Sequence, residues 1–226
     1  MSYISFKDVR KEYIMGEVTI KAVDGVDFHI EKGEFAIIVG PSGAGKTTVL
    51  NMLGGMDACT SGEILVDGTR VSDFGAKQLT QYRRNDIGFV FQFYNLVQNL
   101  TALENVELAA QICRDPMDAK EVLEHVGLGH RLGNFPAQLS GGEQQRVAIA
   151  RAIATHPPII MADEPTGALD SKTGRHVLEI LRSLYREGTT ILLITHDDGI
   201  AATARRVVRL SDGKVVADHP QEVDWT

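Results

Sequence analysis

Continuous apolar runs recur along the chain, and segments with the apolar spacing of an amphipathic helix follow many of them. The segments that we expect to be strands are residues 35–39, 87–91, 158–162, 190–195 and 206–210, and several of them are continuous apolar runs. A strand that is apolar at nearly every position is typical of a parallel sheet covered on both faces. The helical patterns lie at residues 46–53, 142–155 and 171–187. Strands and helices in alternation predict an α/β fold.

A different pattern marks the N-terminal third of the chain. Short segments of alternating apolar and polar residues lie at residues 4–9, 18–31 and 63–71. Asp24-Gly25 and Asp67-Gly68 favour tight turns between antiparallel strands. We therefore predict an antiparallel β layer in addition to the α/β core. Residues 214–217 are predicted to form a last strand.

The middle of the chain differs from both patterns. Residues 92–136 contain no long run of β-branched residues, and the apolar spacing from residue 102 to residue 128 is mostly helical. This favours a helical subdomain over residues 92–136, inserted into the α/β core. The prediction is a single domain over residues 1–226, in which residues 1–91 and 137–226 form the core and the β layer.

The composition excludes several classes of protein. The 226 residues include 23 Lys and Arg against 30 Asp and Glu, so the formal net charge is −7. An acidic balance argues against a broad nucleic-acid surface, which needs clustered cations. No apolar run approaches the roughly 20 residues of a membrane span, and the first residues lack the pattern of a secretory signal. Cys59 and Cys113 are too few for a disulfide framework or a zinc site, so we expect a reduced, cytosolic protein.

One glycine-rich segment carries specific chemistry. Gly40-Pro-Ser-Gly-Ala-Gly45-Lys46-Thr47 fits the pattern G-x-x-x-x-G-K-[ST], directly after an apolar run and at the start of a helical pattern. Glycines let backbone N–H groups turn toward phosphates, and a helix N-terminus favours negative charge. Lys46 is then expected to reach the β- and γ-phosphates, and the Thr47 hydroxyl to ligate Mg²⁺.

A pair of acids ends another apolar run. Asp163 and Glu164 follow residues 158–162, and adjacent carboxylates there are costly unless a metal or a substrate uses them. In a fold with a phosphate loop, we expect Asp163 near Mg²⁺. Glu164 is expected to face the γ-phosphate and to polarise the attacking water. A surface turn with two solvated acids is the alternative explanation.

A further segment identifies a family when it is taken with these motifs. Leu139-Ser-Gly-Gly-Glu-Gln-Gln-Arg146 alone could be a serine-capped helix start. Together with the rest, it resembles the LSGGQ signature of ABC-type ATPases, and the resemblance covers essentially the whole chain with its motifs in the family's order. It implies the ABC ATPase fold, which is a P-loop NTPase core with an antiparallel β layer and an inserted α-helical subdomain.

The resemblance also implies a role for each motif residue, with ATP and Mg²⁺ as cofactors. Tyr13 matches the position that stacks on adenine, Gln92 the Q-loop, Ala168-Leu169-Asp170 the D-loop, and His196 the switch histidine. The implied nucleotide-binding residues are Tyr13, Gly40, Pro41, Ser42, Gly43, Ala44, Gly45, Lys46, Thr47, Thr48, Gln92, Ser140, Gly141 and Gly142. Thr47, Gln92 and Asp163 are the implied metal ligands. Glu164, His196 and Lys46 are the implied catalytic residues.

Partners follow from the same resemblance. It implies a head-to-tail dimer with a second copy of the chain, in which Ser140 and Gly142 of one subunit contact ATP held by the other. It also implies transmembrane permease subunits, whose coupling helix is expected to dock on the helical subdomain and the Q-loop, and no nucleic acid. The expected location is cytoplasmic, peripheral on the inner face of the cell membrane.

A narrower likeness concerns Phe89 to Gln92, Leu100 to Val106 and Ala162 to Gly174. These segments resemble the lipoprotein-releasing and macrolide-exporting branch (LolD- and MacB-like), which implies a motor subunit for transport. FtsE-like ATPases, which regulate a membrane partner without transport, share much of the pattern and are the alternative. Glu143 stands where the family more often has Gln, and Phe93 where close relatives often have a second Gln.

Other ATPase classes fit the sequence less well. Soluble ABC ATPases of DNA repair or translation carry a long coiled-coil insertion between the Q-loop and the signature, or two cassettes in one chain. Here only 48 positions separate Gln92 from Ser140, and there is one cassette. A metabolic P-loop kinase or GTPase would not explain the signature and His196 together.

Overall fold

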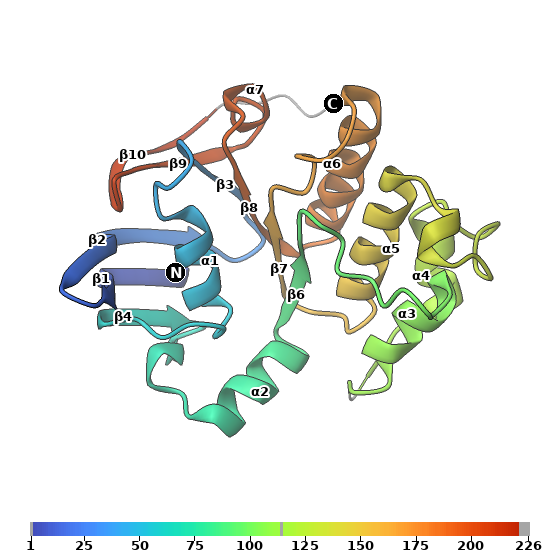
Figure 1. Ribbon diagram of the computed structural model, residues 1–226, viewed down its shortest axis with the longest axis horizontal. Helices are drawn as coiled ribbons and strands as arrows, with labels where there is room; N and C mark the ends of the chain where they lie inside the picture. The colour runs from blue at the N-terminus through green and yellow to red at the C-terminus, as the bar shows by residue number, and fades with distance from the viewer. Residues whose placement is uncertain (1, 114, 222–226) are drawn as a thin grey trace. The chain divides into compact units, whose positions relative to one another are not determined.

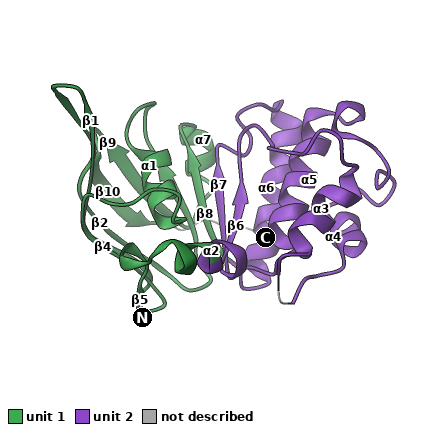
Figure 2. Cartoon of the chain, turned by 60° about the horizontal axis from the view of Figure 1, so that its bottom comes forward, with its two compact units in different colours: residues 1–80, 190–226 green, residues 81–189 purple. Residues whose placement is uncertain are grey.

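The computed structural model describes residues 2–113 and 115–221. It divides the chain into two compact units, residues 1–80 with 190–226 and residues 81–189 (Figure 2). Each unit has its own strands and its own buried apolar residues. The helical subdomain proposed from the sequence, residues 92–136, lies within the second unit and stays a prediction.

The first unit contains an antiparallel sheet with the strand order β2-β1-β4-β5. Its strands are β1 (Ser2–Met15), β2 (Val18–Glu31), β4 (Ser61–Val66) and β5 (Thr69–Arg70). In β1, Ile4 and Phe6 are buried, and the ring of Phe6 stacks on that of Phe28 in β2 with 4.5 Å between the centroids. The alternating sequence pattern therefore supplies one buried face, and the predicted antiparallel layer is confirmed.

Only one of the two predicted Asp-Gly turns is present. Asp67 and Gly68 have φ angles of 49° and 73° and join β4 to β5 in a two-residue turn. The turn predicted at residues 24–25 is wrong, because β2 runs through both of them. Gly25 has a φ of 71° and lies where the pairing of β2 with β1 shifts register after Val9. Its positive φ therefore accommodates a β-bulge inside a strand rather than a turn.

The first unit also holds four strands in the order β10-β9-β3-β8. They are β3 (Phe35–Val39), β8 (Thr190–Thr195), β9 (Arg206–Ser211) and β10 (Lys214–Pro220), and α1 (Lys46–Leu53) comes after β3 in the chain (Figure 1). β3 pairs in parallel with β8 and β9, whereas β10 is antiparallel to β9. Every residue of β3 and β8 is buried. The strands predicted here are confirmed, because an uninterrupted apolar run fits a strand covered on both faces.

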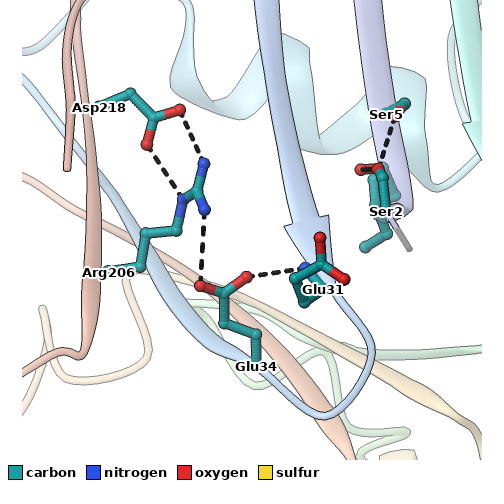
Figure 3. Close-up of polar contacts among 7 residues, drawn as sticks. Ser2, Ser5, Glu31, Glu34, Arg206 and Asp218 are labelled. Carbon is teal, nitrogen blue, oxygen red and sulfur yellow. Dashed lines mark hydrogen bonds and ion pairs between the residues drawn. The ribbon is translucent and has the colours of Figure 1, made fainter. Parts of the chain in front are cut away.

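Ion pairs hold the strand ends of this unit in place (Figure 3). Arg206, at the start of β9, donates from Nε and Nη2 to the two carboxylate oxygens of Asp218 in β10, at 3.0 and 2.8 Å. Its Nη1 lies 3.7 Å from Oε1 of Glu34, whose Oε2 accepts a hydrogen bond from the backbone N–H of Glu31. A bidentate pair fixes the guanidinium plane. The β9–β10 hairpin is thereby tied to the turn that leads into β3.

The second unit contains a parallel pair of strands and a group of helices (Figure 1). The strands are β6 (Ile87–Val90) and β7 (Ile159–Asp163), and the helices are α3 (Ala102–Ala110), α4 (Ala119–His125), α5 (Gly141–Ile153) and α6 (Ser171–Arg186). α5 packs against α3, α4, α6 and β6. The helical pattern predicted from residue 102 to residue 128 forms two helices, with Pro116 between them, because proline interrupts a helix.

The hydrophobic pattern does not predict α2 (Ala76–Asn85), in which Tyr82 is the buried residue. A helix with so few buried positions has no apolar stripe for a periodicity to reveal. The shorter elements are α7 (Asp198–Ala201) and the 3₁₀ turns Val71–Asp73 and Pro136–Gln138. Within residues 2–113 and 115–221, no helix combines the length and the apolar composition needed to cross a bilayer.

Candidate functional site

The glycine-rich loop joins β3 to α1 in the first unit and follows a course that requires glycine. Gly43 and Gly45 have φ angles of 81° and 95°, in the left-handed region that glycine adopts without strain. A Cβ atom on Gly45 would lie 2.3 Å from the carbonyl oxygen of Ala22, and one on Gly40 would lie 2.2 Å from that of Leu210. The loop therefore packs directly against neighbouring backbone, and a side chain at position 40 or 45 would push the loop out of place.

Lys46 begins α1 and is only 7% exposed, a rare environment for an ammonium group. Its Nζ donates to the carbonyl oxygens of Gly40 and Pro41 at 2.8 and 3.0 Å, so the side chain folds back over the loop. In the described part of the chain, no side chain caps the start of α1, so that N–H groups of the first turn are available to an anion. A cation and a helix N-terminus at one loop are suited to phosphate.

The other loop positions differ in how far solvent reaches them. Pro41, Ser42, Gly43 and Thr47 are exposed, whereas Ala44 is buried. Thr48, one position further into α1, is half-buried. A ligand from solvent can therefore reach the loop backbone at residues 41–43 and the hydroxyl-bearing residue Thr47.

Tyr13 in β1 is 38% exposed, and its hydroxyl donates to Oδ2 of Asp57 at 2.6 Å. Nζ of Lys11 donates to Oδ1 of the same carboxylate at 2.5 Å and lies 4.9 Å from the centre of the Tyr13 ring. Burial raises the pKa of Tyr13, and the hydrogen bond to Asp57 raises it further. Burial alone would raise the pKa of Asp57, but the hydrogen bonds from Lys11 and Tyr13 hold it below its ordinary value.

Asp57 is a residue that sequence reasoning missed. It lies 44 positions from Tyr13 and belongs to no motif, so no spacing in the sequence indicates the contact. Its effect is to anchor the tyrosine hydroxyl, and this restricts the orientation of a ring that stays partly open to solvent.

His196 directly follows β8 in the first unit and is exposed. The next residue, Asp197, caps α7 and accepts hydrogen bonds from the backbone N–H groups of Gly199 and Ile200 at 2.7 and 3.3 Å. The cap fixes the turn at which the chain leaves the strand. His196 thus occupies a defined position at the carboxyl end of a buried parallel strand.

In the second unit, β7 ends at Asp163, and Glu164 follows with a φ of 48°. A positive φ is uncommon for a residue other than glycine and is often found at functional sites. The carbonyl oxygen of Glu164 accepts from the N–H of Gly167 at 3.0 Å, which closes a tight turn. A Cβ atom on Gly167 would lie 3.0 Å from Nε2 of Gln92. The structure therefore brings the Gln92 side chain beside the turn that carries Glu164.

The signature segment starts α5, and Ser140 is its N-cap. Oγ of Ser140 accepts from the N–H of Glu143 at 3.3 Å, and Oε2 of Glu143 accepts from the N–H of Ser140 at 2.8 Å, a reciprocal capping box. Arg131 donates to the other carboxylate oxygen of Glu143 at 2.9 Å. The hydrogen bond from the backbone N–H of Ser140 lowers the pKa of Glu143 most, and the hydrogen bonds from the Ser140 hydroxyl and from Arg131 lower it further. Burial acts in the opposite direction. Glu143 therefore stabilises the start of α5 within the signature segment.

Gly142 lets the starts of α5 and α6 approach each other. A Cβ atom there would lie only 2.1 Å from Cγ2 of Thr173. Thr173 in turn donates from Oγ1 to Oδ2 of Asp170, the N-cap of α6, at 2.5 Å. The structure thus brings the signature glycine next to the segment that ends at Asp170. The sequence does not indicate Thr173, which belongs to no motif.

Arg151 of α5 holds the segment that follows Gln92. Its guanidinium donates to the carbonyl oxygens of Tyr94 and Asn95, two residues with φ angles of 55° and 52°. Burial lowers the pKa of Arg151. A Cβ atom on Gly141 would lie 2.8 Å from the Tyr94 hydroxyl, so the Q-loop and the signature are neighbours. Arg151 is a third residue that the sequence does not indicate, since its partners are backbone atoms more than 50 positions away.

The donor chemistry of the predicted metal ligands fits Mg²⁺. Among residues 2–113 and 115–221, no three His, Cys, Asp or Glu side chains form a group able to hold a metal ion. Mg²⁺ does not need such a group, because it usually takes one or two protein oxygens together with waters and substrate phosphates. Thr47, Gln92 and Asp163 offer a hydroxyl, an amide and a carboxylate oxygen, all hard donors.

A glycine loop between a buried parallel strand and a helix, with a nearly buried lysine, defines the class of P-loop nucleotide-binding proteins. Residues 23–167 match the family described as ABC transporter. The chain belongs to this family, as its ATP-binding ATPase domain, and the predicted family is confirmed.

The sequences of several relatives align with nearly the whole chain. An uncharacterized ABC transporter ATP-binding protein of Thermotoga maritima is 50% identical over 213 residues, which are 92% of this chain and 91% of the relative. The ABC transporter ATP-binding protein MJ0796 of Methanocaldococcus jannaschii is 49% identical, with 94% of each chain covered. A macrolide export ATP-binding/permease protein MacB of Paracoccus denitrificans is 46% identical over 95% of this chain. The chain spans only 33% of that relative's length.

Solved structures confirm the predicted fold. The dimeric structure of a post-hydrolysis state of the MJ0796 cassette bound to ADP and Pi has a TM-score of 0.89 at 44% identity, over 98% of this chain and 100% of the other. The structure of cbiO1 from Clostridium perfringens, part of the ABC transporter complex cbiONQ, has a TM-score of 0.86 at 27% identity, over 97% of this chain and 88% of the other. The fold of this chain is that of the ABC ATPases.

Proposed function

We propose that this chain is the ATP-hydrolysing motor subunit of a membrane ABC transporter of the lipoprotein-release or macrolide-export type. The observation that carries the proposal is the loop at residues 40–47, where left-handed glycines, an uncapped helix start and a nearly buried Lys46 occur together. The transport type is supported by the 46% identity to a MacB ATP-binding/permease protein and by the motif segments around Val106 and Ala168.

Phosphate binding is proposed for the loop of the first unit. Lys46 would exchange its bonds to the carbonyl oxygens of Gly40 and Pro41 for bonds to the β- and γ-phosphates. Such bonds are stronger because both partners are charged. The loop N–H groups of residues 42–45 would hold the phosphates from the other side. Tyr13, with its hydroxyl tied to Asp57, would present its ring to the adenine.

Hydrolysis is proposed to use the acids of the second unit and the histidine of the first. Thr47, Gln92 and Asp163 would hold Mg²⁺, which neutralises charge on the phosphates. Glu164 would orient the attacking water and accept its proton as the new bond to phosphorus forms and the β–γ bridge breaks. His196 is the proposed partner of the γ-phosphate.

A head-to-tail dimer belongs to the same proposal. Ser140 and Gly142 of one copy would contact the ATP held by the other copy, and hydrolysis would open the interface. The relative with ADP and Pi bound is dimeric, which supports this arrangement. In this chain the capping box of Ser140 with Glu143 and the close approach of Gly142 to Thr173 position the signature at the start of α5.

The permease is proposed to dock on the second unit, beside the Q-loop. A groove of about 360 Å³ lies there, and Ile87, Phe89, Phe91, Asn95, Ile112 and Arg151 contribute to its lining. The rings of Phe89 and Phe91 are stacked, with 5.4 Å between their centroids. Aromatic and aliphatic side chains in a groove suit the apolar face of a short helix. Phe93, which is 74% exposed, would extend the contact. This placement gives the chain a peripheral position on the inner face of the membrane.

The experiment that tests the proposal is affinity capture of tagged Glu164→Gln protein with ATP from detergent-solubilised membranes. Mass spectrometry then identifies the captured proteins. We expect a membrane protein with about four spans and a large extracytoplasmic domain. A Phe89→Asp variant of the same bait is the control and is expected to lose that partner while still binding ATP.

The identity of the partner decides between transport and the alternative. A transporter permease supports the motor role proposed here, whereas a membrane protein of cell division would support an FtsE-like ATPase that acts without transport. Capture of soluble proteins only, with ATP-dependent dimers still forming, would contradict the transporter assignment and leave the ATPase chemistry intact.

A further inference from the structure

A hollow on the second unit is lined by cations, although the chain as a whole carries a formal charge of −7. Its volume is about 640 Å³, and its lining residues come from helices α5 and α6. These two helices are neighbours in the second unit (Figure 1). The lining of the hollow consists of Arg146 from α5 and of Lys172, Thr173, Arg175, His176, Glu179 and Arg182 from α6. Four of these side chains are Lys or Arg and one is Glu, so the hollow is strongly positive.

Few of these cations are neutralised by carboxylates. Glu179 pairs with Arg182 at 3.4 Å and is shared with Arg186 at 2.9 Å. Within the described residues, Lys172 and Arg175 are exposed and have no carboxylate at ion-pair distance. The nearby acid Asp170 already accepts hydrogen bonds from the start of α6. Among the described residues that line the hollow, one carboxylate, that of Glu179, is therefore set against four permanent cations.

Arg146 adds a second observation, from the other helix. Its Nε is buried, and the structure gives that atom no hydrogen-bond partner among the described residues. Burial lowers the pKa of Arg146, while the charge of Glu143 works in the opposite direction. Glu143 is itself engaged by Ser140 and Arg131. A partly buried guanidinium without a bonded counterion is costly, and an anion in the hollow would lower that cost.

We propose that this hollow, the α5–α6 basic site, binds a phosphate-bearing anion. Guanidinium groups present pairs of N–H donors that match phosphate oxygens, and Lys172 adds a point charge. The phosphate is supplied either by an anionic lipid headgroup or by a soluble oligophosphate. Thr173, which is part of the lining, also contacts the signature glycine Gly142, so the occupant of the site is placed to affect the start of α5.

The α5–α6 basic site shares no residue with the proposed nucleotide site, and its test does not depend on ATP hydrolysis. The probes are tripolyphosphate in solution and vesicles of phosphatidylcholine with or without phosphatidylglycerol. Saturating Mg²⁺-ADP is present throughout, so that binding at the glycine loop does not contribute. Calorimetry measures the first probe and vesicle flotation the second.

The variant is Lys172→Gln with Arg175→Gln, two exposed side chains outside the nucleotide site. Loss of two charge-assisted contacts is expected to weaken binding by about tenfold or more. The matched control, Lys77→Gln with Lys120→Gln, removes the same charge from exposed positions elsewhere and is expected to bind like the wild type. The conservative pair Lys172→Arg with Arg175→Lys is expected to retain most of the affinity.

Each outcome decides the proposal. Tripolyphosphate binding that only the Lys172/Arg175 variant loses identifies a soluble phosphate, and vesicle binding with the same pattern identifies a lipid headgroup. If neither probe binds the wild type, or if the variant and the matched control weaken equally, the proposal is wrong. Binding of a polyglutamate peptide while both phosphate probes stay silent would also overturn it, because the occupant would then be an acidic protein segment.

Discussion

At Lys46, two backbone carbonyl oxygens hold an ammonium group that is almost fully buried. Neutral acceptors stabilise a cation less than the oxygens of a phosphate do. Glu164, which follows β7 with a φ of 48°, is held by the turn to Gly167 rather than by a regular strand. Both residues are thus placed by backbone geometry, and a change of side chain should affect chemistry more than folding.

Replacing Lys46 with alanine is expected to weaken ATP binding by at least about tenfold, because a hydrogen bond to a charged group contributes about 1.5–3 kcal/mol. Isothermal titration calorimetry with Mg²⁺-ATP measures the affinity. Lys77→Ala, a change at an exposed lysine of α2, is the control and should bind normally. An unchanged affinity for Lys46→Ala would refute the role given to this residue.

Glu164→Gln is expected to lower ATP turnover by about 10²–10⁴-fold, the usual effect of removing a general base. ATP affinity should stay the same, because the amide keeps the size of the carboxylate. Phosphate release and calorimetry on one preparation separate the two quantities. Glu107→Gln, on the exposed face of α3, serves as the control. If the Glu164→Gln protein turned over ATP at the normal rate, another residue would be the base.

At the scale of elements, the start of α5 depends on two devices. The capping box of Ser140 and Glu143 satisfies N–H groups that a helix leaves unpaired. Gly142 leaves room for the methyl group of Thr173 at the start of α6. The signature is therefore positioned by a local cap and by one long-range contact, and the two can be tested separately.

Gly142→Ala is expected to destabilise the protein by about 1–3 kcal/mol, the usual cost of an overpacked contact. Alanine gains up to about 1 kcal/mol over glycine within a helix, so the clash with Thr173 should prevail. Adding Thr173→Ser removes the opposing Cγ2 but keeps the hydroxyl that bonds Asp170, and should restore the stability. Urea denaturation measures all three proteins. If Gly142→Ala alone were as stable as the wild type, α5 and α6 would be able to move apart without lowering the free energy of unfolding.

The capping carboxylate predicts a dependence on pH. Because its pKa in the folded protein is lowered from the ordinary 4.5, Glu143 stabilises the fold fully above that pH. The contribution is lost as the pH falls through the lowered value. Glu143→Gln should therefore be less stable than the wild type near neutral pH, and the difference should shrink on acidification below 4.5. Urea denaturation at several pH values tests this, and a difference that stayed constant with pH would contradict it.

At the scale of the whole molecule, the motif residues are divided between the two compact units. Tyr13, Lys46 and His196 belong to the first, whereas Gln92, Ser140 and Glu164 belong to the second. One unit thus carries the phosphate loop, and the other the acids and the signature. The proposed reaction needs groups from both units and, for the signature, from a second copy.

The Glu164→Gln protein is expected to form a stable dimer when ATP is present, because ATP joins the copies and is not hydrolysed. Sedimentation velocity at micromolar protein measures the assembly. The double variant Glu164→Gln with Lys46→Ala should stay monomeric, since it lacks the proposed phosphate contact. Monomers alone at saturating ATP, with ATP bound, would count against the head-to-tail dimer.

The sequence alone determined the parallel strands, the antiparallel layer and the motifs. The position of each strand and of each motif depends on residues that are close together in the chain. The apolar run at residues 35–39 requires a strand covered on both faces. The loop from Gly40 to Thr47 contains, within eight positions, the glycines that its backbone conformation requires. For the same reason the motifs are sufficient to identify the family.

The tertiary structure alone decided the contacts between distant segments. Asp57 holds Tyr13, and Arg151 holds the backbone of Tyr94 and Asn95, although nothing in their spacing indicates either pair. The glycine at residue 25 forms a bulge instead of a turn, because its partner strand continues past it. Such outcomes depend on which surfaces meet in three dimensions, and that is set by the packing of whole elements rather than by local sequence.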